Sequence, residues 1–179
     1  MKRFHVFGAS GSGTTSFGRG LASSLSIPHH DTDDYYWVPT DPPFQEKRPI
    51  PKRLSLMKEM FLPLESWVLS GSLVSWSETV IPYFDAVIFV SLDNDIRLKR
   101  VEQREEQRYG KAALQPGGAR HEAYKAFLEW NGLYEDPDFD GRSRAVHERW
   151  LNSLDCPVYR IDSSNSVDEM IKDFLSKLV

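Results

Sequence analysis

Residues 8–15 read Gly8-Ala9-Ser10-Gly11-Ser12-Gly13-Thr14-Thr15. A short β-prone run, Phe4 to Phe7, comes directly before them, and apolar residues recur every four positions after them, at Phe17, Leu21 and Leu25. We therefore predict a strand, a glycine loop and a helix in that order. Glycines let such a loop turn its backbone N–H groups inward, and the free amides of the following helix add to the same anion site.

The loop matches the phosphate-binding pattern GxxxxGK[ST] at every fixed position except one, because Thr14 stands where the pattern has lysine. Thr15 takes the place of the hydroxyl that binds Mg²⁺. Thr14 can donate one hydrogen bond but carries no charge, and a cation on the transferred phosphoryl group is worth about 10³–10⁵ in rate in the arginine-finger case. Either another cation replaces the lysine or catalysis has been lost. A glycine-rich turn that binds no nucleotide is the alternative interpretation.

Four further apolar runs predict the other strands of one sheet. The clearest, Ala86 to Leu92, is continuous and rich in β-branched residues, which is typical of a parallel strand covered on both faces. Strands that alternate with helices predict a three-layer α/β/α fold around a five-stranded parallel sheet. The remaining predicted strands are Ile27–His30, Trp67–Leu69 and Val158–Ile161, and the remaining helical patterns carry Leu54, Met57, Phe61 and Leu64, then Ile96 to Arg108, then Val146, Trp150 and Leu154.

Two segments interrupt this alternation. Residues 39–51 hold five of the 11 prolines, which argues against regular structure and predicts an ordered, extended surface loop. Residues 109–141 follow the helix after the fourth strand, contain several glycines and include a short predicted helix near Ala119 to Asn131. We expect residues 1–179 to form a single domain in which 109–141 is a small lid insert.

An acidic cluster follows the second predicted strand, where the chain reads DTDD at residues 31–34. Carboxylates at the carboxyl end of a parallel strand face the ligand crevice, where one can hold Mg²⁺ and another can orient or deprotonate an acceptor hydroxyl. In an extended segment Asp31 and Asp33 would point to the same side. We select Asp33 first and Asp31 second, and an Asp-rich helix cap or turn is the alternative. Tyr35 to Trp37 either stack on an acceptor or pack beneath the proline-rich segment.

Arginines surround the predicted insert. On a helix that ends at Arg108, four arginines fall within an arc of about 80°. A solvated face paired with glutamates is one interpretation of this stripe, and phosphate contact is the other, which we favour for Arg100 and Arg104 because this helix leads into the insert. Three more, in or beside the insert, could close over a triphosphate and exclude water. The stripe is Arg97, Arg100, Arg104 and Arg108, and the three are Arg120, Arg142 and Arg144.

Composition limits the classes of protein. The 179 residues carry a formal charge of −4, which argues against a general nucleic-acid-coating surface. No segment approaches the roughly 20 unbroken apolar residues that span a bilayer. The N-terminal residues lead directly into the glycine loop without an apolar signal core. We expect a cytoplasmic protein that binds neither membrane nor nucleic acid.

Taken in order, these pieces resemble the P-loop kinases of the adenylate kinase and shikimate kinase type over almost the whole chain, with a phosphate loop that lacks its lysine. The resemblance implies a sheet order of 2-3-1-4-5, a lid, and transfer of the γ-phosphoryl group of ATP to a small acceptor held near the second strand. The chain departs from adenylate kinases at Thr14 and at Ser70-Gly71, where they have an aspartate before the glycine. The resemblance rests on GASGSGTT at 8–15, DTDD at 31–34, LSG at 69–71, RLKRVEQR at 97–104 and the arginine-bearing insert.

The leading prediction is an ATP-binding, Mg²⁺-dependent phosphotransferase that acts on a nucleotide or another small acceptor. The alternative, favoured by Thr14, is a catalytically weak nucleotide-binding or sensing protein whose output is lid closure. A kinase of polynucleotide ends is less favoured because no basic stripe follows the proline-rich segment. In the leading prediction phosphates lie on residues 8–15 and Arg142, the metal on Thr15 and Asp33, and the catalytic groups are Asp33, Asp31, Arg100, Arg104 and Arg144.

Overall fold

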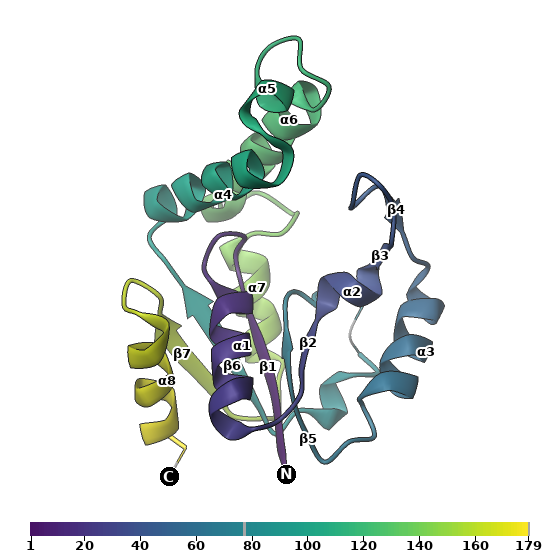
Figure 1. The fold of residues 1–179 in the computed structure, drawn as a ribbon. Helices are drawn as coiled ribbons and strands as arrows, with labels where there is room; N and C mark the ends of the chain where they lie inside the picture. The colour runs from purple at the N-terminus through teal and green to yellow at the C-terminus, as the bar shows by residue number, and fades with distance from the viewer. Residues whose placement is uncertain (77, 179) are drawn as a thin grey trace.

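One five-stranded parallel sheet organises the computed structural model, which describes residues 1–76 and 78–178 (Figure 1). Every neighbouring pair of its strands is parallel. Counted within this sheet, the strand order is 2-3-1-4-5, so the predicted fold class and order are confirmed. In spatial order the strands are β2 (His29–Asp31), β5 (Ser66–Ser70), β1 (Lys2–Gly8), β6 (Ala86–Ser91) and β7 (Val158–Asp162).

Helices cover both faces of the sheet and complete the three layers. On one face lie α1 (Thr14–Leu25) and α8 (Val167–Ser176), where Phe17 of α1 meets Phe174 of α8 edge to face at 6.1 Å. On the other lie α3 (Ile50–Met60) and α7 (Arg144–Asn152). Successive strand residues point to opposite faces and so supply both cores.

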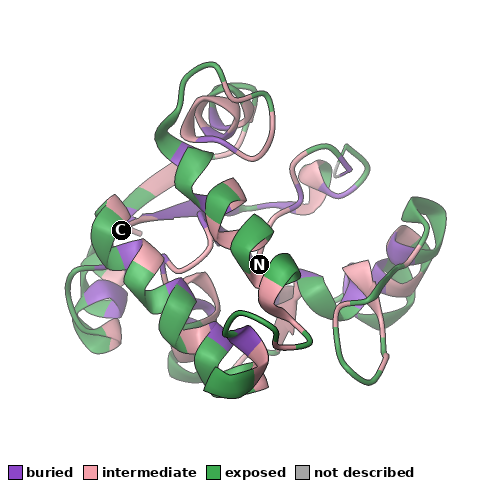
Figure 2. Cartoon of the chain, turned by 90° about the horizontal axis from the view of Figure 1, so that it is seen from above, coloured by how far each residue is buried: buried purple, intermediate pink, exposed green. Residues whose placement is uncertain are grey.

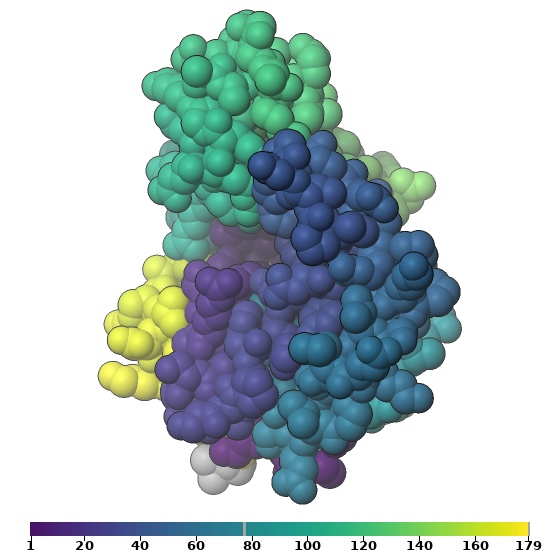
Figure 3. Space-filling model, turned by 45° about the vertical axis from the view of Figure 1, so that its right-hand side comes forward, coloured from purple at the N-terminus to yellow at the C-terminus, as the bar shows by residue number. Residues whose placement is uncertain are grey.

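Residues 109–141, which were predicted to form a lid insert, lie beyond the carboxyl ends of the strands and keep the name lid. Helix α4 (Asn94–Tyr109) leaves the sheet after β6 and leads into α5 (Lys111–Leu114), α6 (His121–Gly132) and the short 3₁₀ turn η2 (Leu133–Glu135). Figures 1 and 3 show this green segment at the top of the molecule, facing the dark-blue segment that contains β3 (Trp37–Val38) and β4 (Glu46–Lys47).

Burial differs between these parts of the molecule. In Figure 2 the central strands are mostly buried, whereas the outer faces of the helices and the lid are exposed.

A second 3₁₀ turn, η1 (Ile81–Tyr83), leads into β6. No helix in the described ranges combines the length and the apolarity that crossing a membrane requires.

Two expectations of local structure were wrong. The proline-rich residues 39–51 were expected to lack regular structure, but β4 pairs antiparallel with β3, and α3 begins at Ile50 with proline in its first turn. Proline is tolerated there because the first helical N–H groups have no partner within the helix.

The acidic cluster is not extended either. Asp31 ends β2, and one of its carboxylate oxygens accepts a hydrogen bond from the Asp33 backbone N–H at 3.0 Å, which caps the short helix α2 (Thr32–Tyr36). The helix-cap alternative therefore holds for Asp31. Helix α8 was not predicted from the sequence, although Ser166 and Glu169 form a capping box at its start.

Candidate functional site

The phosphate-binding loop, residues 8–15, joins the end of β1 to the first turn of α1. A Cβ atom on Gly8 would lie 2.2 Å from the carbonyl oxygen of Val90, and one on Gly11 would lie 2.5 Å from that of Arg97. Larger residues therefore do not fit at these two positions. Helix α1 has no side-chain cap, so its first amides remain free for an anion.

A chain of hydrogen bonds lies at the helix end of the loop. The Thr15 hydroxyl donates to Asp31 Oδ2 at 2.9 Å, and the Ser70 hydroxyl donates to the same oxygen at 3.2 Å. Nε2 of His29 lies 2.9 Å from the Ser70 oxygen. Thr15 was predicted to bind the metal together with Asp33, but the carboxylate that accepts a hydrogen bond from Thr15 belongs to Asp31.

Asp33 instead faces the cavity described below. Its surroundings raise the pKa of its carboxyl group, first because the cavity walls remove solvent from it and second because Asp31 lies nearby. The positive charges of Arg142 and Arg104 oppose this shift. Asp33 is exposed to the cavity space and does not lie in the hydrophobic core.

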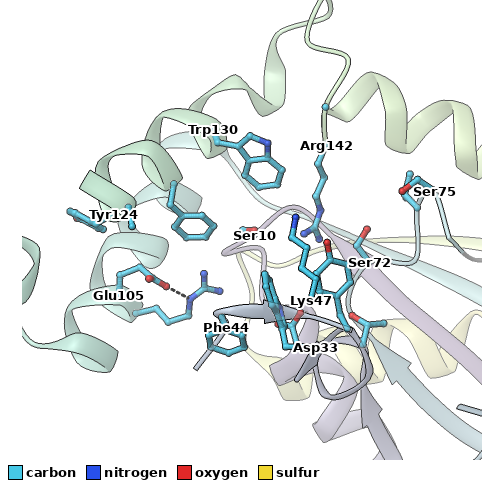
Figure 4. Close-up of a pocket in the computed structure, with 18 of the residues that line it drawn as sticks. Ser10, Asp33, Phe44, Lys47, Ser72, Ser75, Glu105, Tyr124, Trp130 and Arg142 are labelled. Atoms are coloured by element: carbon cyan, nitrogen blue, oxygen red, sulfur yellow. Dashed lines mark ion pairs between the residues drawn. The ribbon is translucent and has the colours of Figure 1, made fainter. Parts of the chain in front are cut away.

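The cavity has a volume of about 940 Å³ and lies between the lid and the wall formed by α2, β4 and α3. Ser10 is the one residue of the phosphate loop that lines it. Figure 4 shows Arg142 and Lys47 entering from opposite walls, with Asp33 below them and Trp130 of the lid above. Its aromatic lining consists of Tyr36, Trp37, Phe44, Trp76, Tyr109, Tyr124, Phe127 and Trp130, and its basic lining of Lys47, Arg53, Arg104, Arg108, Arg120 and Arg142.

Several cavity arginines lie over cavity aromatics. The Arg53 guanidinium is 3.8 Å from the centre of the Tyr36 ring, and that of Arg108 is 4.6 Å from the centre of the Phe44 ring. The second contact joins α4, the helix that leads into the lid, to the segment between β3 and β4. This lining was not predicted from the sequence, because an aromatic stripe such as Phe127 and Trp130 has the same spacing as a core helix face.

The four arginines of α4 have different surroundings. Arg97 is 1% exposed and donates to the carbonyl oxygens of Ser10, at 3.0 Å, and Asn131, at 2.7 Å. It therefore connects the phosphate loop to the lid. Arg100 lies beside the loop, since its Nη1 is 3.8 Å from where a Cβ on Gly13 would be. Arg104 lines the cavity, and its Nε is 3.5 Å from Glu105.

The two arginines that follow the lid diverge. Arg142 lines the cavity, and its Nη2 donates to the carbonyl oxygen of Gly8 at 3.0 Å. Arg144 points away from the cavity, where its guanidinium makes two hydrogen bonds to Glu135, at 2.6 and 2.7 Å. The structure therefore brings together the loop, Asp31, Asp33, Arg100, Arg104 and Arg142, and it does not bring Arg144 to them.

The parallel sheet of order 2-3-1-4-5, the glycine loop after its first strand and the lid over its carboxyl edge define a P-loop kinase fold of the adenylate kinase and shikimate kinase type. Solved structures with this fold cover nearly the whole chain. Shikimate kinase from Aquifex aeolicus vf5 matches with a TM-score of 0.54 and 17% identity over 98% of this chain and 95% of that one. Deoxyadenosine kinase from M. mycoides with bound dATP matches with a TM-score of 0.59 and 14% identity over 98% of each chain. A gluconokinase from Sinorhizobium meliloti 1021 matches with a TM-score of 0.52 and 17% identity, over 99% of this chain and 91% of that one.

The chain belongs to the family of YqaC, an uncharacterized protein of Bacillus subtilis (strain 168). The two are 42% identical over 177 residues, which are 99% of this chain and 97% of YqaC. No protein-family model matches the chain. The comparisons thus establish the fold and the family of the chain.

Proposed function

We propose that the protein is an ATP-dependent phosphotransferase that binds the triphosphate on residues 8–15 and transfers its γ-phosphoryl group to an acceptor in the cavity. One observation carries this proposal: the phosphate loop meets the cavity at Ser10 and Arg142, and Asp33 faces the same space. An anion site, a carboxylate and a ligand-sized space therefore adjoin one another, which is the arrangement that group transfer between two bound substrates requires.

The oxygen groups at Thr15 suit Mg²⁺. This ion takes oxygen ligands and is usually held by one or two carboxylates together with substrate phosphates. Thr15 and Asp31, hydrogen-bonded at 2.9 Å, supply a hydroxyl and a carboxylate. Within residues 1–76 and 78–178 no group of three or more histidine, cysteine or acidic side chains could hold a metal, so the phosphates would complete the ligand set. Bound there, Mg²⁺ would neutralise charge on the phosphate oxygens.

Asp33 is the proposed base. It would accept the proton of the acceptor hydroxyl as the acceptor oxygen attacks phosphorus, and its raised pKa suits that task better than an ordinary carboxylate. Where the acceptor carries a phosphate in place of a hydroxyl, no proton is removed and Asp33 orients the acceptor. Arg100 and Arg104 would hold phosphate oxygens from the α4 side.

The lining of the cavity favours a nucleotide as the acceptor. Aromatic rings on the lid can stack on a nucleobase, and arginines can bind a phosphate through paired N–H groups. A small hydroxy acid or sugar would use the cations but leave much of the aromatic surface uncovered.

Phosphorus NMR tests the proposal. The protein would be incubated with Mg-ATP and a panel of nucleosides, nucleoside monophosphates, sugars and hydroxy acids, while the γ-phosphate signal is followed. Transfer to at least one acceptor, lost in Asp33→Asn, is the expected result. ATP binding without transfer to any acceptor would refute it.

A second function is favoured by Thr14 alone. A loop without the lysine can still bind phosphates through its amides, so a nucleotide-binding protein with little turnover fits this one residue. The same NMR panel separates the two, because that protein would bind ATP and leave the γ-phosphate in place.

A further inference from the structure

A cation is needed at the border between the phosphate loop and the cavity, because the transferred phosphoryl group must cross it. Two conditions define such a cation: its side chain contacts the loop, and it lines the cavity. Arg97 donates to the loop at Ser10 but does not line the cavity, and Lys47 and Arg104 line the cavity without a hydrogen bond to the loop. In the described part of the chain, Arg142 alone meets both conditions.

The Arg142 guanidinium has capacity to spare for a ligand. A guanidinium has five N–H donors on three nitrogens. In Arg142 the nitrogen that donates a hydrogen bond is Nη2, to the Gly8 carbonyl oxygen. Its Nε is buried without a hydrogen-bond partner, and no carboxylate of the described residues lies within 4.0 Å of it in an ion pair. Burial also lowers its pKa. An enclosed cation without an ion-pair partner is costly, and a phosphate group would remove that cost.

We propose that Arg142 does the work of the missing loop lysine. In this assignment, which rests on the proposed function, the guanidinium binds the γ-phosphate at the mouth of the loop and stabilises the charge on the phosphoryl group during transfer. The acceptor oxygen forms a bond to the γ-phosphorus while the bond to the β,γ-bridging oxygen breaks. The bridging electron pair leaves with ADP, and the acceptor proton passes to Asp33.

In this assignment the positive charge at the phosphate comes from a different part of the chain than in the usual phosphate loop. A lysine at position 14 would be carried by the rigid start of α1, whereas Arg142 directly follows the lid residues 109–141. The cation is therefore attached to the lid side of the site.

A charge-transplant experiment tests the assignment. Dissociation constants for Mg-ATP and Mg-ADP would be measured by calorimetry, and melting temperatures without ligand, for the wild type, Arg142→Met, Thr14→Lys and the double variant. We expect Arg142→Met to weaken ATP binding about 10- to 100-fold, as loss of a charge-assisted hydrogen bond does, and ADP binding less than about threefold.

The double variant decides between a catalytic and a structural role. Thr14→Lys should restore ATP binding to Arg142→Met to within about threefold of wild type, yet add less than about threefold in the wild-type background, which is the coupling expected of two groups that serve one site. Arg149→Met, at an exposed arginine of α7, is the matched control and should match wild type.

Several results would overturn the assignment. Equal losses for ATP and ADP, no loss, or no rescue by Thr14→Lys would show that Arg142 only supports Gly8. If Arg142→Met fails to fold, Arg142→Lys replaces it. That variant keeps a charge and should retain ATP binding within about tenfold of wild type and a preference for ATP over ADP, and loss of the preference would contradict the assignment. A wild type that does not bind ATP would refute the proposed function itself, and this inference with it.

Discussion

The loop side and the lid side of the candidate site are built in different ways. On the loop side, glycines touch the backbone of neighbouring elements and the adjoining strands are buried, so the residues that form the site also form the core. On the lid side, α6 buries only Asn131 among the described residues, and its aromatic stripe faces the cavity. Substitutions on the loop side should therefore affect folding and binding together, whereas those on the lid side should affect binding alone.

The largest expected effect tests the loop side. Gly11→Ala places a Cβ atom 2.5 Å from the Arg97 carbonyl oxygen at a φ of +84°, so it should abolish ATP binding and lower stability by about 2 kcal/mol or more. Gly132→Ala is the matched lid control, since nothing lies within 4 Å of its Cβ position, and it should leave ATP binding unchanged. Urea unfolding and calorimetry measure both. Equal effects of the two substitutions on stability and ATP binding would contradict the difference between the loop side and the lid side.

Asp33→Asn should separate catalysis from stability. It removes the proposed base, so kcat should fall about 10²–10⁴-fold. Because the folded-state pKa of Asp33 is raised, ionised Asp33 destabilises the folded state above that pKa, and the melting temperature at pH 7 should not fall. The wild-type pH–rate profile should show an acidic limb above the usual aspartate pKa, absent from the variant. Asp34→Asn is the control, because Asp34 does not line the cavity. An unchanged kcat in Asp33→Asn would show that Asp33 is not the base.

Two aromatic substitutions compare core and lid directly. Phe89→Ala, at a core residue 1% exposed, should cost about 3–5 kcal/mol of stability, whereas Phe127→Ala in the lid should cost less than about 1 kcal/mol. Phe127→Ala should instead raise KM for an aromatic acceptor about tenfold, through lost stacking. Equal losses of stability would show that the lid stripe is a core face after all.

These contrasts explain what could be predicted from the sequence. The glycine loop and the parallel strands were predictable because glycine spacing and continuous apolar runs reflect backbone geometry, whereas the sheet order was predicted only through the resemblance to P-loop kinases. The Asp31 cap could not be told from an extended segment, since four residues satisfy both patterns. The cavity lining was missed because periodicity shows that Phe127 and Trp130 share a face but not whether that face meets core or empty space. The position of Arg144 depended on Glu135, nine residues away on a turn that no pattern predicts.

The free energy of unfolding should be smaller at acidic pH than at neutral pH, because two histidines are buried in the core. His5 and His147 are fully buried, and burial lowers the pKa of each to about 3, from 6.5. As pH falls below 6.5, the unfolded chain takes up protons that the folded chain does not, so stability is lost, by about 2–3 kcal/mol per histidine at pH 4.5. Urea unfolding at pH 7 and 4.5 measures this loss. His5→Phe should reduce it, and a loss of the same size in that variant would contradict the assignment to His5.

The smallest effect concerns Arg144. Its two hydrogen bonds to Glu135 lie on a partly exposed surface, so Arg144→Gln should cost at most about 1 kcal/mol of stability. ATP affinity and transfer rate should change less than about twofold. A tenfold loss of transfer rate would show that Arg144 takes part in catalysis, as was predicted from the sequence.

The central claim is that residues 8–15 bind a nucleoside triphosphate although Thr14 has replaced the lysine. Calorimetric titration of the wild-type protein with Mg-ATP tests it most directly, with Gly11→Ala as the reference without a working loop. We predict saturable binding, with a dissociation constant of about 1 μM to 1 mM, as kinases commonly show for substrates, and no binding by Gly11→Ala. Absence of binding by the wild type at millimolar ATP, or equal binding by both proteins, would contradict the account.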